Sequence, residues 1–387
     1  MSVTAARGFL ACGVRSGMKT EGLDLALVRS TTPAVGAAMF TQNRVQAAPV
    51  IVSRRHLDQA QPQAVVLNSG CANAATGQRG ELDALATATE AARLLELSSE
   101  QILLCSTGVI GVKLPLDKLL PGLALAAPVL SEKGGDDAAR AIMTTDTRPK
   151  QASASAAGFT VGGMAKGAAM IHPQLATMLA IITTDYPLEP GEPARFLRPA
   201  VEHSFNRISV DGDCSTNDTV ILLANGTGGV ERSQATDQEF SRLLGQVCHE
   251  LAEQIVKDAE GFTVLMEVNV RGAVDEGQAV AIAARIASSP LVKTAAFGHD
   301  PNWGRVMMAA GSAPWNGGYA ELDPSKVTLA FNGTQVLANG AQIDAAPAME
   351  GVSCVIDLEL GLGKGCASYL ASDLSYEYVR LNAEYTT

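Results

Sequence analysis

One segment of the sequence carries residues suited to covalent chemistry. It runs from Lys166 to Asp185 and reads KGAAMIHPQLATMLAIITTD, and the hydroxyl of Thr177 is enclosed by mostly apolar residues on both sides. A threonine at the start of a chain can act as a nucleophile, because its own α-amine can take the hydroxyl proton. A threonine inside a helix or strand more often hydrogen-bonds a neighbouring carbonyl, and composition alone favours this structural role.

A second polar cluster follows at Val210–Asp218, with the sequence VDGDCSTND. Its three carboxylates suggest a Ca²⁺ loop, but the glycine placement and the bidentate glutamate of such a loop are missing. We therefore interpret this run as a polar turn, in which Asp, Ser and Thr side chains satisfy nearby backbone groups.

Familiar catalytic and cofactor motifs are absent from the sequence. It contains no G-x-x-x-x-G-K-[ST], no complete G-x-G-x-x-G, no H-E-x-x-H and no G-x-S-x-G. Its five histidines are scattered without the spacing of metal ligands. We expect no metal site, no nucleotide-binding loop and no serine-hydrolase elbow.

Elements of mixed α/β character must position the chemical residues. Short apolar runs between Gly, Asn or Pro predict strands at Ala34–Phe40, Pro49–Ser53, Ala64–Gly70, Thr219–Gly226 and Thr263–Gly272. Apolar residues spaced by three and four predict helices at Glu81–Leu95, Lys133–Met143, Asp237–Asp258 and Glu276–Ala287. Near the end, KVTLAFNG, TQVLANG and SCVIDLELG predict antiparallel strands, which favours layered α+β mixed sheets over a doubly wound sheet.

Composition narrows the class of protein. The 387 residues include 40 acidic and 29 basic side chains, and the net charge of -11 disfavours nucleic acid and anionic membrane surfaces as partners. The longest strongly apolar stretch, Leu119–Leu130, is shorter than the roughly 20 residues of a membrane span. Seven dispersed cysteines suit reduced thiols, so we expect a cytoplasmic protein.

The segment around Thr177 also resembles a known signature. KGAAMIHPQLATML is similar to that of the glutamate N-acetyltransferases, also called ornithine acetyltransferases or the ArgJ family. The resemblance runs through nearly all of the chain. Further matches are NSGCANAATG (Asn68–Gly77), STGVIG (Ser106–Gly111), IMTTDTRPK (Ile142–Lys150), FNRISVDGDCSTNDT (Phe205–Thr219), KDAEG (Lys257–Gly261), SPLVKTA (Ser289–Ala295), DPNWGR (Asp300–Arg305) and the terminal YVRLNAEYTT. So many ordered matches outweigh the structural interpretation of Thr177.

The resemblance implies that the chain cuts itself between Ala176 and Thr177. The products would be an α chain of residues 1–176 and a β chain of residues 177–387 that begins with the nucleophile. The implied fold is the layered α/β fold of this family, with Thr177 at the end of a central strand. The two chains would stay interlocked, and two such pairs would form a heterotetramer.

The resemblance also implies ping-pong transfer of an acetyl group from N-acetylornithine to glutamate, in arginine biosynthesis. It assigns Thr107 and Gly108 to the oxyanion hole and Lys166 to the catalytic centre beside Thr177. The substrate contacts that it implies are Thr144, Lys166, Thr177, Glu260, Asn382 and Thr387. No cofactor is expected, and no residue decides whether acetyl-CoA is a second donor.

Two other functions are compatible with parts of the pattern. A self-processed aminopeptidase or amidase of a sister family would share the fold and the N-terminal nucleophile, and would pass the acyl group to water. An inactive paralogue could serve as a binding protein, but the joint presence of Thr107, Lys166, Thr177 and Asn382 argues against it.

Overall fold

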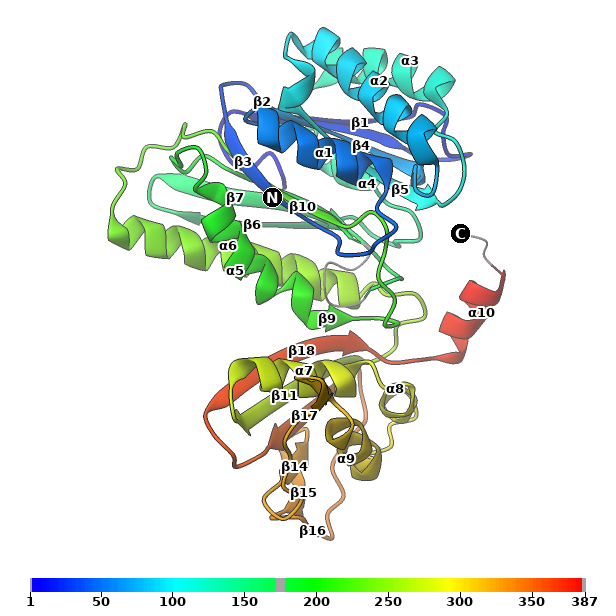
Figure 1. Cartoon of the computed structure of the whole chain (residues 1–387), viewed down its shortest axis with the longest axis vertical. Coiled ribbons are helices and arrows are strands. Elements are labelled where there is room, and N and C mark those ends of the chain that lie inside the picture. The colour runs from blue at the N-terminus through cyan, green and yellow to red at the C-terminus, as the bar shows by residue number, and fades with distance from the viewer. Residues whose placement is uncertain (1, 172–177, 385–387) are drawn as a thin grey trace.

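Two β-sheets packed face to face form the larger part of the molecule, with helices on both outer faces. The computed structural model describes residues 2–171 and 178–384 (Figure 1). The first sheet has the order β1 (Phe9–Val14), β2 (Leu25–Ser30), β4 (Ala64–Cys71) and β5 (Ile102–Val109). The second has the order β3 (Val35–Phe40), β10 (Thr219–Ala224), β8 (Leu179–Thr184), β7 (Phe159–Lys166) and β6 (Lys150–Ala156).

Helices complete the four layers of this sandwich. The first sheet is covered by α1 (Ala48–Gln59), α2 (Gly77–Leu95) and α3 (Leu116–Ala126), and the second by α5 (Pro193–Glu202) and α6 (Gln234–Val256). The short helix α4 (Gly135–Ala141) packs beside β1 and β2. Short 3₁₀ turns lie at η1 (Ser99–Gln101), η2 (Ala127–Val129) and η3 (Phe205–Arg207).

Apolar residues lie on both faces of the strands because each sheet packs against the other sheet on one face and against helices on the other. Val65 and Leu103 of the first sheet pack in the same cluster as Leu179 and Ile181 of the second, and all four are at most 2% exposed. The opposite face of β8 packs against α6 in a separate cluster. Because both faces of the second sheet are covered, all six residues of β8 are buried, which accounts for its apolar run from Leu179 to Ile182.

The central strands β7 and β8 are antiparallel neighbours, with Lys166 opposite Leu179. β8 also pairs in parallel with β10, so it has a hydrogen-bonded partner on each side. The segment between β7 and β8 contains positions 172–177, which lie outside the described residues. The predicted cleavage site, Ala176 and Thr177, is among them.

A C-terminal lobe, built around a seven-stranded sheet, lies below the sandwich in Figure 1. The sheet order is β16 (Ala341–Gln342), β15 (Thr334–Ala338), β14 (Thr328–Phe331), β17 (Ser353–Glu359), β11 (Leu265–Ala273), β18 (Gly365–Ser372) and β9 (Ile208–Ser209). One face is covered by α7 (Glu276–Ala287), α8 (Pro290–Phe297) and α9 (Trp303–Gly311), with the small hairpin of β12 (Pro314–Trp315) and β13 (Gly318–Tyr319) beside them. The chain ends with α10 (Tyr376–Glu384), which has no buried residue.

The predicted mixed α/β class is confirmed, and one predicted strand is wrong. Pro49–Ser53 lies in α1, where Pro49 occupies the first turn and Val50 and Val52 face the interior. Proline suits the first turn of a helix because its fixed φ is helical and its missing N–H is not needed there. A five-residue apolar run cannot distinguish a buried strand from the buried side of a helix.

Among the described residues, no single helix has the length and hydropathy of a membrane span. The helices α7 and α8, which are bent by 59° at their junction, reach the required length and hydropathy only when they are taken together.

Candidate functional site

A cavity of about 170 Å³ lies where the sandwich, the C-terminal lobe and α10 meet. Its lining includes every predicted site residue that falls within residues 2–171 and 178–384: Thr107, Gly108, Thr144, Lys166, Glu260 and Asn382. The other lining residues are Thr145, Ala169, Met170, Asp211, Asp213 and Tyr378. Ala176, Thr177 and Thr387 lie outside the described residues. The structure thus brings together six residues that are spread over most of the sequence.

Three of these residues lie at the ends of strands. Thr107 and Gly108 lie near the end of β5, and Lys166 is the last residue of β7. Gly108 has φ +131°, and a Cβ there would come within 2.3 Å of the Gly70 carbonyl carbon. Only glycine fits this close approach of the parallel strands β5 and β4, which leaves the main chain of residue 108 open to the cavity.

Lys166 is 2% exposed although it carries an ammonium group. Its Nζ donates to Thr107 Oγ1 at 3.3 Å and lies 3.9 Å from Asp146 Oδ2. Burial lowers the pKa of Lys166, and the nearby Asp146 carboxylate opposes this only in part. Because an ammonium can only donate, Thr107 accepts this hydrogen bond, and its own hydroxyl proton remains free for another acceptor.

A buried network of charged side chains lies next to Lys166. Lys150 is fully buried, and its Nζ lies 2.5 Å from both Asp146 Oδ1 and Asp258 Oδ2. Asp146 also accepts the main-chain N–H groups of Gly167, at 2.7 Å, and Thr144, at 3.0 Å. Burial acts to raise the pKa of Asp146, but the ammonium groups of Lys166 and Lys150 outweigh it and hold that pKa well below its usual value.

The sequence analysis missed Asp146, Lys150 and Asp258 as parts of the site. Asp258 follows Lys150 by 108 residues, so no local pattern could indicate their contact. The only signal was that these residues fall within IMTTDTRPK and KDAEG, two of the runs that carry the family resemblance.

The remaining two predicted residues contact each other across the cavity. Asn382 Nδ2, on α10, donates to Glu260 Oε2 at 2.8 Å, and the Glu260 main-chain N–H donates to the Ala168 carbonyl at 2.9 Å. A second contact joins α10 to the sandwich, because Tyr378 Oη donates to Asp211 Oδ2 at 3.3 Å. The otherwise exposed terminal helix is therefore fastened to the cavity wall by two polar side chains.

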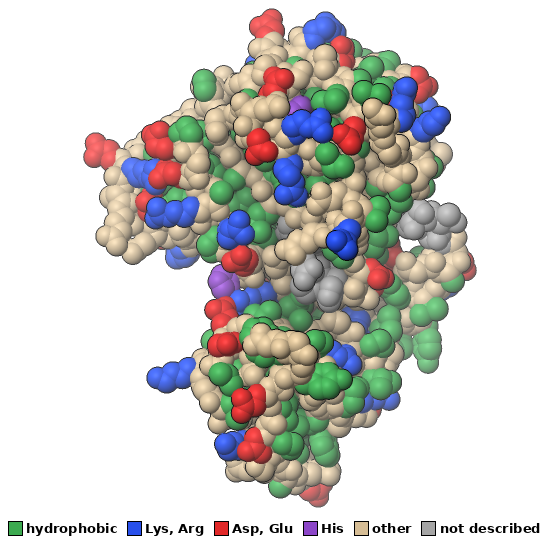
Figure 2. Space-filling model, in the orientation of Figure 1, with side chains coloured by type: hydrophobic (Ala, Val, Ile, Leu, Met, Phe, Trp, Pro, Cys, Tyr) green, Lys and Arg blue, Asp and Glu red, His purple; other side chains and the backbone are tan. Residues whose placement is uncertain are grey.

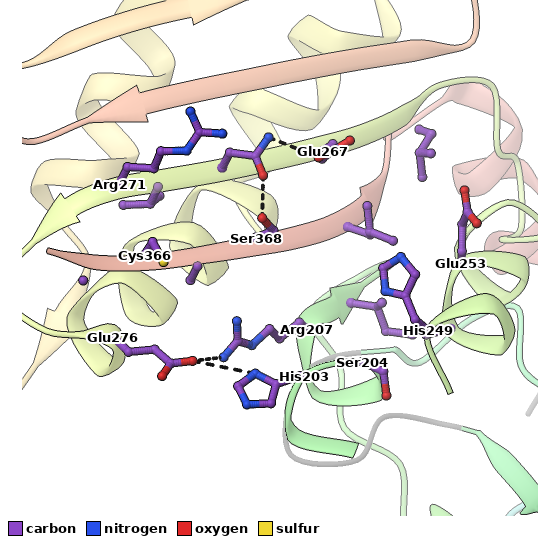
Figure 3. Close-up of a pocket in the computed structure, with 18 of the residues that line it drawn as sticks. His203, Ser204, Arg207, His249, Glu253, Glu267, Arg271, Glu276, Cys366 and Ser368 are labelled. Carbon is purple, nitrogen blue, oxygen red and sulfur yellow. Dashed lines mark hydrogen bonds and ion pairs between the residues drawn. The ribbon is translucent and has the colours of Figure 1, made fainter. Parts of the chain in front are cut away.

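A larger cavity, of about 730 Å³, lies in the hollow between the two lobes (Figures 2 and 3). Its lining combines basic and acidic groups, and Figure 3 shows Arg207 and His203 turned toward Glu276. In this lining, Asn269 of β11 accepts a hydrogen bond from Ser368 Oγ of the neighbouring strand β18 at 2.6 Å. None of the predicted site residues that the structure describes lines this cavity, so the smaller cavity is the candidate active site. In the part of the chain that the structure describes, no three His, Cys, Asp or Glu side chains are grouped as a metal site would need.

Comparison with known proteins identifies the family. A model described as the ArgJ family matches residues 10–387. The chain belongs to the ArgJ family. The arginine biosynthesis bifunctional proteins ArgJ of Mycolicibacterium paratuberculosis and Streptomyces coelicolor are 46% and 45% identical to it, over 100% of this chain and 96% and 100% of theirs. The predicted family and the predicted link to arginine biosynthesis are confirmed.

A solved structure is also similar in sequence to part of this ArgJ-family chain. It is the ornithine acetyltransferase of Mycobacterium tuberculosis complexed with ornithine, which is 46% identical, with a TM-score of 0.43. The match covers 44% of this chain and 94% of that one.

The buried carboxylate Asp146 should make stability depend on pH. Asp146→Asn should lower the free energy of unfolding at pH 7 by about 3 kcal/mol, because two buried ammonium groups lose an anion. The pKa of Asp146 is lower in the folded than in the unfolded chain, so its contribution is complete above the unfolded pKa of about 4 and is lost as the pH falls through the folded pKa. Urea unfolding at several pH values should show the two proteins converging below about pH 4. A difference that is constant with pH would contradict this role.

Proposed function

We propose that this ArgJ-family enzyme moves the acetyl group of N2-acetyl-L-ornithine to L-glutamate through an acetyl-Thr177 intermediate. The observation that carries the proposal is the convergence of Thr107, Lys166 and Glu260 on one cavity, beside the strand β8, which begins two residues after the predicted nucleophile. The family membership supports the acetyltransferase over the sister amidase, whose acyl acceptor would be water.

The first step of the proposal is self-cleavage. The Thr177 hydroxyl attacks the Ala176 carbonyl carbon, the peptide nitrogen takes up a proton, and water hydrolyses the resulting ester. The new α-amine of Thr177 has an ordinary pKa of about 7.7 to 8.0, so near neutral pH it can serve as the base for its own hydroxyl. The pairing of β7 with β8, and of β3 with β10, would hold the α chain (residues 1–176) and β chain (residues 177–387) together after the cut.

The transfer then proceeds in two half-reactions. The Thr177 hydroxyl attacks the acetyl carbonyl of N-acetylornithine while its α-amine takes the hydroxyl proton. Thr107 Oγ1–H and the Gly108 N–H would stabilise the oxyanion, since the contact with Lys166 leaves the Thr107 proton available. Collapse breaks the amide bond, and the α-ammonium returns the proton to the nitrogen of the leaving ornithine. Glutamate takes the acetyl group by the reverse sequence, through its own amine.

The charges around the cavity suit amino-acid substrates. Lys166 supplies a cation for an α-carboxylate, and Glu260 supplies an anion for the side-chain ammonium of ornithine. Thr144 and Asn382 would add polar contacts, and Thr387 is a further proposed contact. Asp211 and Asp213 line the same wall and add to its attraction for the ammonium group.

The proposed cycle draws its nucleophile, base and oxyanion donors from the chain, so it calls for no metal ion or organic cofactor. We place the enzyme in the cytoplasm as a heterotetramer of two α and two β chains. An assay that compares N-acetylornithine with acetyl-CoA as the donor decides whether the enzyme has a second activity. Release of acetate in place of N-acetylglutamate would support the amidase.

Thr177→Ala should give an uncut and inactive chain. The alanine lacks both the hydroxyl that attacks Ala176 and the nucleophile of the transfer reaction. Mass spectrometry of the purified protein and an assay of N-acetylglutamate formation measure the two losses separately. Thr89→Ala, at an exposed position on α2, is the matched control and should be cut and active. An active or cut Thr177→Ala protein would contradict the proposal.

The contacts between α10 and the cavity predict that a tag at the C-terminal end affects activity more than a tag at the N-terminal end. A tag added after residue 387 should lower the rate of acetyl transfer more than the same tag before residue 1, because Asn382 reaches Glu260 from the last helix. Steady-state kinetics of the two tagged proteins provide the measurement. Equal rates for both would argue against a role of the C-terminal end in the site.

A further inference from the structure

The polar run Val210–Asp218 makes contacts that the sequence analysis did not predict. It connects β9 to β10, and its first and last carboxylates turn away from the local turn toward a segment about 40 residues earlier. The predicted bonding within the turn is limited, with Asp213 N–H donating to Asp211 Oδ1 at 3.2 Å. The interpretation of this run as a polar turn is therefore confirmed for Asp211 and Ser215, which accept nearby main-chain N–H groups, but it missed the contacts of Asp211 and Asp218 with the earlier segment.

The beginning of the run holds the chain just before position 172. Asp211 Oδ2 accepts the Met170 N–H at 2.5 Å, and Oδ1 accepts the Ile171 N–H at 2.8 Å. The Ile171 carbonyl in turn accepts the Val210 N–H at 2.8 Å. Met170 has φ +58°, which is costly for a residue with a side chain, so these bonds retain a backbone conformation that the residue would not adopt by preference.

The end of the run holds the chain just after position 177. Asp218 Oδ1 accepts the Met178 N–H at 3.0 Å, and the Met178 carbonyl accepts the Thr219 N–H at 3.1 Å. Asp218 is fully buried, and among residues 2–171 and 178–384 its second oxygen has no hydrogen-bond partner. Burial raises the pKa of Asp218 well above its usual value, although the Met178 N–H and the Lys166 ammonium act against this shift.

We propose that the 210–218 run is a clamp that fixes both ends of the 172–177 segment, with Asp211 and Asp218 as positioning residues for the reactions of Thr177. At Ile171 both the N–H and the carbonyl group are held by this run, and at Met178 the N–H is held by Asp218 and the carbonyl by Thr219, the residue that follows the run. The inference rests on the proposed function, since it takes the Ala176–Thr177 bond as the one that is cut.

The physical benefit of the clamp is orientation. Fixing Ile171 and Met178, on either side of a six-residue segment, removes conformational freedom that the chain would otherwise lose when the hydroxyl reaches the carbonyl. After the cut, Met178 remains bonded to the carbonyl carbon of Thr177, so Asp218 continues to orient the nucleophile during acetyl transfer. Asp211 belongs to the β chain and holds Met170 and Ile171 of the α chain across the break.

The test compares the rate of self-cleavage in freshly synthesised chains, followed by mass spectrometry, for Asp211→Ala, Asp218→Ala and Asp218→Asn. The two alanine variants should cut at least about tenfold more slowly than wild type, as expected for the loss of a buried hydrogen bond that orients the reaction. Asp218→Asn should recover most of the rate, because its amide oxygen can still accept the Met178 N–H. Should the alanine variants not fold, Asp211→Asn takes their place. Its single acceptor oxygen cannot serve both Met170 and Ile171, so this variant should also cut slowly.

Asp185→Ala is the matched control. Asp185 is 2% exposed, follows the opposite end of β8, and accepts the main-chain N–H groups of Thr160 at 2.6 Å and Arg7 at 3.2 Å. It should lose thermal stability as the clamp variants do, yet cut within about twofold of wild type. An equal slowing of Asp185→Ala, or a folded Asp218→Ala that cuts at the wild-type rate, would overturn the clamp.

Acetyl transfer is measured on the same proteins. A wild-type chain that cuts itself but forms no N-acetylglutamate would overturn the proposed function and leave the comparison of cleavage rates valid. An active wild type whose clamp variants cut normally would overturn the clamp alone. A wild-type chain that stays whole would overturn both.

Discussion

The antiparallel pairing of β7 with β8 is the constraint on which the rest of the site depends. It sets Lys166 opposite Leu179, so the ends of both strands meet at the same edge of the central sheet. The strand β8 is buried on both faces and paired on both sides, which fixes the chain that follows position 177. A break in the connection between these strands would cut one loop and leave the sheet and both apolar cores intact. The fold can therefore tolerate the self-cleavage that the proposed mechanism needs.

Buried charge is the second feature that shapes the site. Lys166 is kept out of water beside Thr107, and the Asp146–Lys150–Asp258 network lies behind it. Such networks seldom add net stability, because each ion loses its hydration. Here Asp146 also fixes the main chain at Thr144 and Gly167 on two sides of the cavity. We infer that the network serves the geometry of the site more than the stability of the fold.

Local patterns predicted only part of the framework, and the central strands β7 and β8 were not among the predicted strands. The runs at Ala64–Gly70 and Thr219–Gly226 are strands because continuous apolar residues suit strands that are covered on both faces. The helix over Glu276–Ala287 has the predicted bounds, since Asp275 caps it by accepting the Gln278 N–H. The predicted strand at Pro49–Ser53 failed because five residues carry too little periodicity. The grouping of Thr107 with Lys166, 59 residues later, came from the family resemblance, and no spacing rule could have provided it. The roles of Lys150 and Asp211 were missed because each depends on contacts between distant segments.

The central claim is that Thr177 carries the acetyl group as the first residue of a separate chain. Intact-mass measurement of the enzyme after incubation with N-acetylornithine, without glutamate, tests it most directly. The account predicts two chains, with the fragment 177–387 heavier by one acetyl group at Thr177, and the loss of that group when glutamate is added. An active enzyme with an unbroken chain, or with a fragment that never gains the acetyl group, would contradict it.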